Sequence, residues 1–175
     1  MKKITRILVP TDLSPLSAEA TEYAKILAKA LHAKLFVTYV FDLSMFLVGE
    51  PDNNLTFVEL WPEFENNATR DLKKFVSRNF RGLMNVETHL LRGNPHDELV
   101  RFAKEKRCDL IVMATHGRTG LAQVVGSVAE RVARHSTVPV LLIKPEQMKR
   151  ELPRRHKTRR SSGVRKATLL PIGRR

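Results

Sequence analysis

Short apolar runs alternate along this chain with longer stretches whose apolar residues recur at helical spacing, and this alternation limits the fold more than any other feature. A connection between neighbouring parallel strands needs about a helix length of chain. Five strands alternating with four helices therefore predict one α/β domain, an open parallel sheet with helices on both faces. The predicted strands cover residues 4–9, 35–41, 86–91, 109–113 and 138–143, and the predicted helices cover 15–31, 64–80, a segment from Pro95 and a segment from Ser127.

The order of the strands follows from their polarity. The run at 86–91 alternates polar with apolar residues, as an exposed edge strand does, and Pro139 at the start of the last run suits the other edge. With right-handed crossovers the remaining runs lie inside, which predicts the order 3-2-1-4-5. Ligands of open α/β sheets bind beyond the carboxyl ends of the strands where this order reverses, here between the first and fourth strands.

Two loops leave the sheet at that reversal. One is Pro10-Thr11-Asp12, and the other is the glycine-containing stretch 114–127, which precedes a predicted helix. Backbone N–H groups at a helix N-terminus favour phosphate, and glycine lets a ligand approach the main chain, although a simple turn would also use these residues. The carboxylate of Asp12 would suit a ribose hydroxyl or a Mg²⁺ ion beside phosphates, or it would serve only as a turn residue.

Helix starts are marked by recognisable residues. Ser14 before Pro15, and Asn94 before Pro95, predict N-caps followed by proline at the first helical position. Ser127 has two interpretations, since with Glu130 it would also form a capping box that needs no ligand. His116 within the glycine loop would touch a phosphate or be a solvated surface residue.

The chain of 175 residues has a formal net charge of +13, and most of this charge lies at one end. Residues 145–175 hold 11 Lys or Arg against 2 Glu, a net of +9, which leaves +4 for residues 1–144. Few large apolar residues occur in this stretch, so we predict a domain over 1–144 and a basic, disordered tail over 145–175. The tail would bind nucleic acid or an anionic membrane, or would only keep the protein in solution.

No apolar run approaches the length needed to cross a bilayer, and no secretory signal is evident, so a cytoplasmic location is expected. The single Cys108 follows a cationic stretch that would lower the pKa of its thiol, or it is a packing residue. No spacing of His, Cys or Asp predicts a metal site. No Walker loop or Ser/His/Asp signature is present, so the sequence gives no argument for an enzyme.

The segments "ILVPTDLS", "GNPHDELVRFA" and "DLIVMATHGRTGLAQVVGSVAERVARHSTVPVLLIK" resemble the universal stress protein family and cover most of residues 4–144. The resemblance implies the adenine nucleotide alpha hydrolase-like fold. Family members that bind ATP carry Gly, two residues, Gly, nine residues, then Gly with Ser or Thr. Here Ala114 takes the first glycine position, and eight residues separate Gly117 from Gly126.

Position by position, the resemblance implies a nucleotide site with three kinds of contact. Asp12 would contact ribose or phosphates, and Val40 and Met113 would line the adenine slot. Phosphate contacts would come from the glycine loop and the helix start after it. The implied nucleotide-binding set is Pro10, Thr11, Asp12, Val40, Met113, Ala114, Gly117, Gly126, Ser127 and Val128.

The function implied is that of an ATP-binding, non-enzymatic regulator of stress response that acts as a homodimer through its last strand. The alternatives are a nucleotide-free interaction protein of the same fold, and binding of nucleic acid or an anionic surface by the tail. A protein partner is expected without being identified. The long connection over 44–63 would be a lid or partner contact, or would pack over the strand ends.

Overall fold

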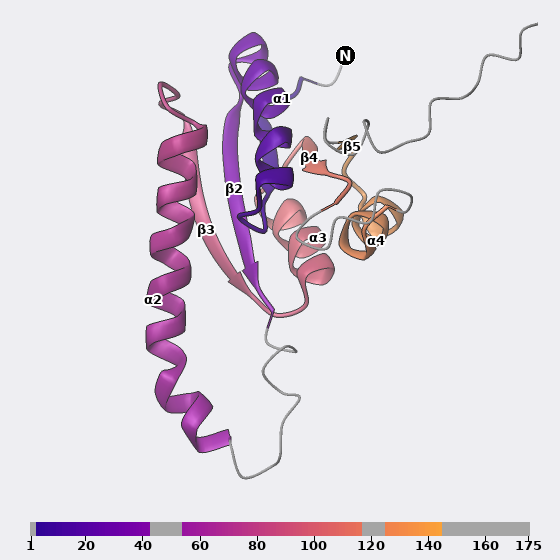
Figure 1. Ribbon diagram of the computed structural model, residues 1–175. Coiled ribbons are helices and arrows are strands. Elements are labelled where there is room, and N and C mark those ends of the chain that lie inside the picture. The colour runs from indigo at the N-terminus through magenta and orange to yellow at the C-terminus, as the bar shows by residue number, and fades with distance from the viewer. Residues whose placement is uncertain (1–2, 43–53, 117–124, 145–175) are drawn as a thin grey trace, which may run out of the picture.

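The computed structural model of the chain describes residues 3–42, 54–116 and 125–144, which form a sheet between two layers of helices (Figure 1). Strands and helices alternate strictly through this region. The elements are β1 (Arg6–Pro10), α1 (Pro15–Leu31), β2 (Lys34–Phe41), α2 (Asn54–Asn79), β3 (Val86–Arg92), α3 (Pro95–Glu105), β4 (Leu110–Ala114), α4 (Ser127–His135) and β5 (Val140–Ile143).

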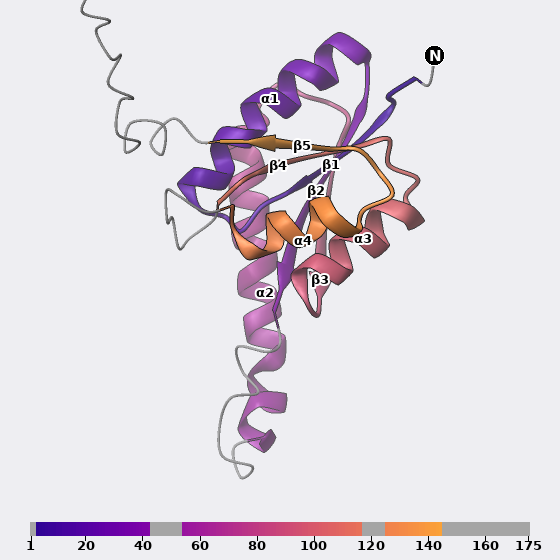
Figure 2. The ribbon, with the colours of Figure 1, turned by 90° about the vertical axis from the view of Figure 1, so that its right-hand side faces the viewer.

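The sheet has the order β3-β2-β1-β4-β5, and every neighbouring pair is parallel. The predicted fold class and strand order are therefore confirmed. Seen along the sheet, α1 lies on one side and α3 and α4 lie together on the other (Figure 2), while α2 runs beside β3 and β2. None of the helices in the described part of the chain combines the length and apolar character that crossing a bilayer requires.

The sheet separates two layers of core, and each buried strand supplies both. Ile7 and Val9 of β1 pack toward α1 and α2, whereas Leu8 between them packs toward α3 and α4. Alternate residues of a strand point to opposite faces, so a strand buried on both faces must be apolar throughout. This requirement explains why β1, β2 and β4 are continuous apolar runs in the sequence.

Two helix starts follow the sequence prediction. The side chain of Ser14 accepts a hydrogen bond from the backbone N–H of Ser17 (3.1 Å), and Pro15 stands in the first turn of α1. In α3, Asn94 Oδ1 accepts from the N–H of His96 at 3.3 Å. Each cap satisfies a donor that the helix leaves unpaired.

The start of α2 differs from the sequence prediction, which placed irregular chain as far as residue 63. The helix begins at Asn54 and contains Pro62 in its interior. Proline usually ends a helix because it lacks an N–H, and it misled the prediction here. The rest of the predicted connection, residues 43–53, lies outside the described residues.

The side chain of Trp61 supports the packing alternative for this segment. Its ring meets Phe41 at the end of β2 edge to face, with 5.1 Å between centroids, and the guanidinium of Arg92 lies 5.2 Å from the Trp61 centroid. Trp61 therefore packs over the carboxyl ends of β2 and β3.

Candidate functional site

The two loops expected to form a site leave the sheet side by side. β1 and β4 are neighbours in register, with Ile7 opposite Leu110. Beyond β1, the N–H of Thr11 donates to the carbonyl of Thr38 in β2 at 2.9 Å. Beyond β4, the N–H of Thr115 donates to the carbonyl of Ile143 in β5 at 2.8 Å. Both loops are thus anchored to the sheet at the reversal of strand order.

The loop after β1 is a tight turn held by its own side chains. The hydroxyl of Thr11, a buried residue, lies 2.8 Å from that of Ser17 and accepts from the N–H of Leu13 at 2.9 Å. Leu13 takes a positive φ of 66°. Asp12 Oδ1 accepts from the N–H of Ser14 (3.1 Å) and from its hydroxyl (2.6 Å). Asp12 therefore performs the turn role that the sequence left open.

Ala114 is the last residue of β4 and fits its position without strain. It pairs with Ile143, and its side chain belongs to the core layer on the α1 side. Ala114 is not one of the described residues that have a positive φ. The methyl group at the first position of the glycine motif thus lies within the hydrophobic core.

Thr115 and His116 form a buried polar pair directly after β4. Their exposed fractions are 8% and 7%, and Thr115 Oγ1 lies 2.8 Å from His116 Nδ1. The prediction of a solvated surface histidine is therefore wrong. Thr115 is not among the site residues predicted from the sequence. Its position between the fourth strand and the glycine loop is the one sequence feature that could have indicated a role in the site.

Gly126 contacts the chain after β4 closely. Its N–H donates to the carbonyl of Thr115 at 2.7 Å, and a Cβ atom on Gly126 would lie only 3.0 Å from that oxygen. The backbone of Gly126, with φ of −59°, would accept any residue, so space is the reason for glycine here.

α4 begins without a side-chain cap from the described residues. Gly126 is its N-cap, Ser127 is the first helical residue and is exposed, and the carbonyl of Gly126 accepts from the N–H of Glu130 at 2.9 Å. The Glu130 carboxylate pairs with Arg134 at 2.6 Å instead of reaching back. The capping-box interpretation of Ser127 is wrong, because the contact of Gly126 with Thr115 places the helix start one residue earlier.

The residues assigned to an adenine slot share one core layer. Val40 of β2 and Met113 of β4 are both buried on the α3 and α4 side, and Val128 packs against the same cluster. Pro10 is buried at the end of β1. Gly117 lies outside the described residues.

Thr38 is a second residue that the sequence analysis missed. It is fully buried in β2 and binds the start of the β1–α1 loop through its carbonyl. Its hydroxyl is the single buried side-chain oxygen or nitrogen in the described part of the chain without a hydrogen-bond partner. A threonine inside an apolar strand gives no sequence signal of this kind.

Cys108 is a packing residue. Only 5% of it is exposed, and burial, with a smaller contribution from the Asp109 carboxylate, raises the pKa of its thiol to about 11. The nearby cations Arg6 and Lys106 lower that pKa by less than burial raises it. In the described ranges no group of three His, Cys, Asp or Glu residues is arranged to hold a metal ion.

Comparison with known proteins places these features in a family context. A sequence model of the universal stress protein family matches residues 3–144. The chain is 38% identical over 141 residues to the universal stress protein MJ0531 of Methanocaldococcus jannaschii, covering 79% of this chain and 81% of that one.

Solved structures agree with this match. Protein MJ0577 of the same organism superposes with a TM-score of 0.73 at 25% identity, covering 83% of this chain and 99% of that one. A universal stress protein solved in complex with cAMP gives a TM-score of 0.60 at 27% identity, covering 82% and 98%.

Proposed function

Because this chain belongs to the universal stress protein family, we propose that it binds an adenine nucleotide, ATP above all, between the β1–α1 loop and the start of α4. We further propose that it acts as a dimeric regulator without enzymatic turnover. The observation that carries the proposal is the start of α4, where glycine takes the place of a capping side chain.

The N-cap residues of α1, α3 and α4 differ in whether their side chains accept a hydrogen bond from the first turn. α1 and α3 have Ser14 and Asn94 to accept from their first-turn N–H groups, whereas no described side chain does this for α4. Unpaired donors and the positive end of the helix dipole favour an anion. Gly126 lets the start of α4 lie close against the Thr115 carbonyl, because a Cβ atom there would approach that oxygen to 3.0 Å, and the first-turn N–H groups would then face the proposed phosphate.

The remaining residues of the proposed site would bind the nucleoside. Val40 and Met113, buried on one side of the sheet, would contact adenine, and Val128 packs beside them. Asp12 would accept from a ribose hydroxyl or contribute to a Mg²⁺ ion held by the phosphates. Pro10, Thr11 and Ala114 would shape the pocket from the strand ends, with Gly117 and Ser127 contributing to phosphate contacts.

A universal stress protein that was solved in complex with cAMP superposes on 82% of this chain. That complex supports an adenine ligand here. In the proposed mechanism ATP shifts an equilibrium between two states of a partner-binding surface. A ligand does this only through different affinities for the two states. Hydrolysis is not part of the mechanism.

We also propose that the dimer forms through β5. This strand lies at the edge of the sheet and pairs in this chain with β4. Its Leu141 is 37% exposed, and an edge strand with an exposed apolar side chain can pair with another chain. Pairing with a second copy across a two-fold axis would cover both the open edge and this side chain.

Two measurements test nucleotide binding. Protein purified without added nucleotide is denatured, and the released small molecules are identified by chromatography; titration calorimetry then compares ATP, AMP and cAMP. We expect released adenine nucleotide and tightest binding of ATP. Absence of released nucleotide together with no heat of binding for any of the three would favour the nucleotide-free interaction protein instead.

A further inference from the structure

The second half of α2 carries a row of cations that the rest of the protein does not balance. Residues 66–81 contain five basic residues against the single acid Asp71, a net charge of +4. Residues 1–144 as a whole also have a net charge of +4, so the remainder of that region is neutral. The row, named here the α2 cation row, is exposed throughout and consists of Arg70, Lys73, Lys74 and Arg78 on α2 and Arg81 in the turn that follows.

Several cations elsewhere in the described part of the chain have close carboxylate partners. Lys34 pairs with Glu87, and Arg101 pairs with two glutamates. In the α2 cation row the one described ion pair is a long contact of 3.6 Å between Lys74 and Asp71. The Arg70 guanidinium donates to the amide oxygen of Asn67, which leaves its charge uncompensated.

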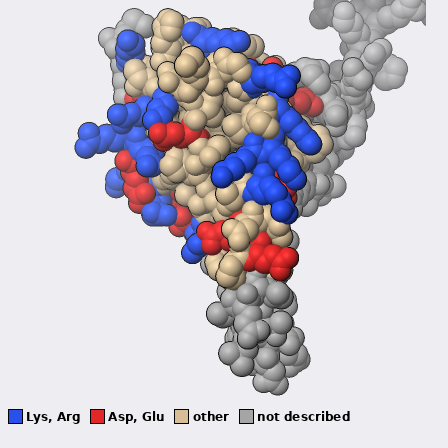
Figure 3. Space-filling view, turned by 90° about the vertical axis from the view of Figure 1, so that its left-hand side faces the viewer, with Lys and Arg blue, Asp and Glu red and all other residues tan. Residues whose placement is uncertain are grey.

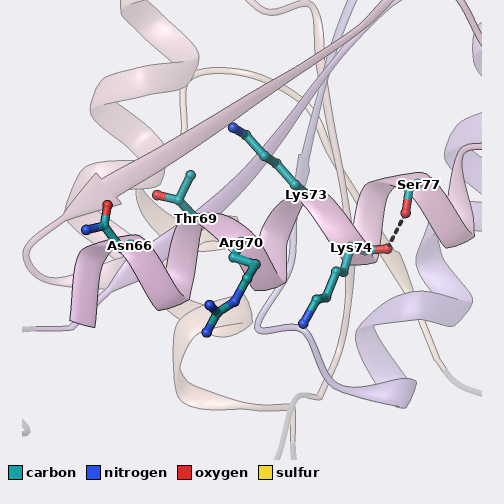
Figure 4. A pocket seen from close by; sticks show the side chains of 6 residues that line it. All are labelled: Asn66, Thr69, Arg70, Lys73, Lys74 and Ser77. Carbon is teal, nitrogen blue, oxygen red and sulfur yellow. Dashed lines mark hydrogen bonds between the residues drawn. The ribbon is translucent and has the colours of Figure 1, made fainter. Parts of the chain in front are cut away.

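The row follows the helix axis and faces outward. Arg70 and Lys74 are four residues apart and extend from one flank of α2, while Lys73 and Thr69 extend from the other (Figure 4). Together with Asn66 and Ser77 these residues line a shallow hollow. Figure 3 looks onto this side of the molecule. Lys and Arg side chains cover more of this face than Asp and Glu side chains, which lie at the left and toward the lower end.

A second hollow continues from the first one. It lies between Leu13 and the first turn of α1 on one side and the face of α2 that carries Asp71, Lys74 and Arg78 on the other. The cations therefore line an extended track. From residue 70 to the end of α2 at residue 79 the helix rises about 14 Å, which corresponds to about four phosphates of one DNA strand.

We propose that the α2 cation row binds the phosphate backbone of nucleic acid. The net charge of +4 over residues 66–81 is not balanced by the neutral remainder of residues 1–144, so phosphates would replace small counterions, whose release drives such binding. Cations on both flanks suit a backbone lying along the helix. Contacts of this kind position a nucleic acid without reading its bases, so no sequence preference is expected.

A membrane surface fits the row less well. Helices that lie on membranes carry large apolar residues beside their cations. The first hollow is lined by asparagine, threonine, serine, arginine and lysine alone. This surface goes beyond the proposed nucleotide site, because its cations lie on α2 and in the turn after it, although its second hollow is also lined by Leu13 and Ser14 of the β1–α1 loop.

The test compares two triple variants of the full-length chain with equal net charge. Arg70→Gln/Lys73→Gln/Lys74→Gln removes three of the five cations of the row. Lys29→Gln/Lys104→Gln/Arg131→Gln removes three exposed cations scattered over α1, α3 and α4, none of which forms an ion pair with another described residue. Both variants keep the 11 cations of residues 145–175. A difference in DNA binding between the two variants would therefore come from the α2 cation row.

Binding to a short fluorescent DNA duplex is measured by anisotropy over a range of salt concentrations. Each lost phosphate contact lowers the slope of log K against log salt by about 0.9, so the row variant should lose about 2 to 3 units of slope. The scattered variant should lose less than about 1. Equal slopes for the two variants, or no binding of the duplex by the wild type, would overturn the proposal.

Vesicles of phosphatidylserine and phosphatidylcholine provide the second arm of the test. The proposal expects similar vesicle binding by the two variants. It is refuted if the row is needed for binding to vesicles and not for binding to DNA. Circular dichroism of both variants checks that the helices remain folded.

Discussion

At Gly126 a hydrogen atom in place of a methyl group determines how closely the start of α4 approaches the end of β4. The Thr115 carbonyl would lie 3.0 Å from an added Cβ, closer than ordinary contacts allow. We predict that Gly126→Ala displaces the helix start and lowers ATP affinity at least tenfold, or by about 1.4 kcal/mol, in titration calorimetry.

Gly82→Ala is the matched control for this substitution. Gly82 has a φ of +80° and nothing within 4 Å of an added Cβ, so alanine there strains the backbone far from the proposed site. It should lower stability by about 1 kcal/mol and leave ATP affinity unchanged. If both variants lose affinity equally, the role assigned to Gly126 is wrong.

The buried thiol of Cys108 predicts a dependence of stability on pH. The unfolded thiol titrates near 9, whereas burial raises the pKa of the folded thiol to about 11. The folded state therefore keeps a proton that the unfolded state releases, and the contribution is complete below pH 9 and lost as the pH rises to about 11. The difference in unfolding free energy between wild type and Cys108→Ala should shrink over this range in urea titrations.

A difference that stays constant from pH 8 to pH 11 would contradict this account of Cys108. The comparison with Cys108→Ala removes the effects of Lys and Tyr, which titrate in the same range in both proteins.

Several residues of the site could be predicted from the sequence because their roles are local. The turn at Asp12 and the caps Ser14 and Asn94 depend on nearby backbone, and these assignments agree with the structure. The roles of Thr115 and Gly126 depend on a contact across the glycine loop, which sequence spacing does not specify. The same contact explains why Ser127 is not a cap.

At the scale of elements, a serine stands near the start of both α1 and α4, but at a different position relative to the first helical residue. Ser14 precedes α1 and caps it, whereas Ser127 is already inside α4. We predict that Ser14→Ala lowers the free energy of unfolding by about 1 kcal/mol, while Ser127→Ala changes it by less than about 0.5 kcal/mol. Chemical denaturation of the two variants measures both values.

The proposed site predicts the opposite order for ligand affinity. A hydrogen bond from the Ser127 hydroxyl to a phosphate contributes about 1.5 kcal/mol or more, so Ser127→Ala should weaken ATP binding roughly tenfold. Unchanged affinity in this variant would remove Ser127 from the proposed phosphate contacts.

Strands were easier to predict than the start of α2. β1, β2 and β4 consist mainly of apolar residues because helices cover both of their faces, and this requirement appears directly in the sequence. The segment before Phe64 contains Pro62, which favours a helix end, yet the helix extends back to Asn54. Local propensity therefore gave the wrong boundary for this element.

For the whole molecule, the open edge at β5 predicts a dimer. Leu141→Lys would place two charges near each other at the proposed two-fold axis, where little water remains to solvate them. We expect this variant to sediment as a monomer at concentrations at which the wild type is a dimer. Met84→Lys, at a residue 98% exposed just before the opposite edge strand, should leave the dimer intact.

A wild-type monomer, or a Leu141→Lys dimer, would show that β5 is not the interface. Analytical ultracentrifugation over a range of protein concentrations distinguishes these outcomes.

Pairing of β1 with β4 also bears on how the chain reaches its native state. Asp109 accepts hydrogen bonds from the N–H groups of Thr5 and Arg6 and from the Thr5 hydroxyl, across a separation of 104 positions at Thr5. The middle of the sheet thus closes only after most of the domain has been synthesised. Proteins rich in such distant contacts fold slowly. On the ribosome, the β1-α1-β2 portion would wait with one side of its first strand uncovered until β4 emerges.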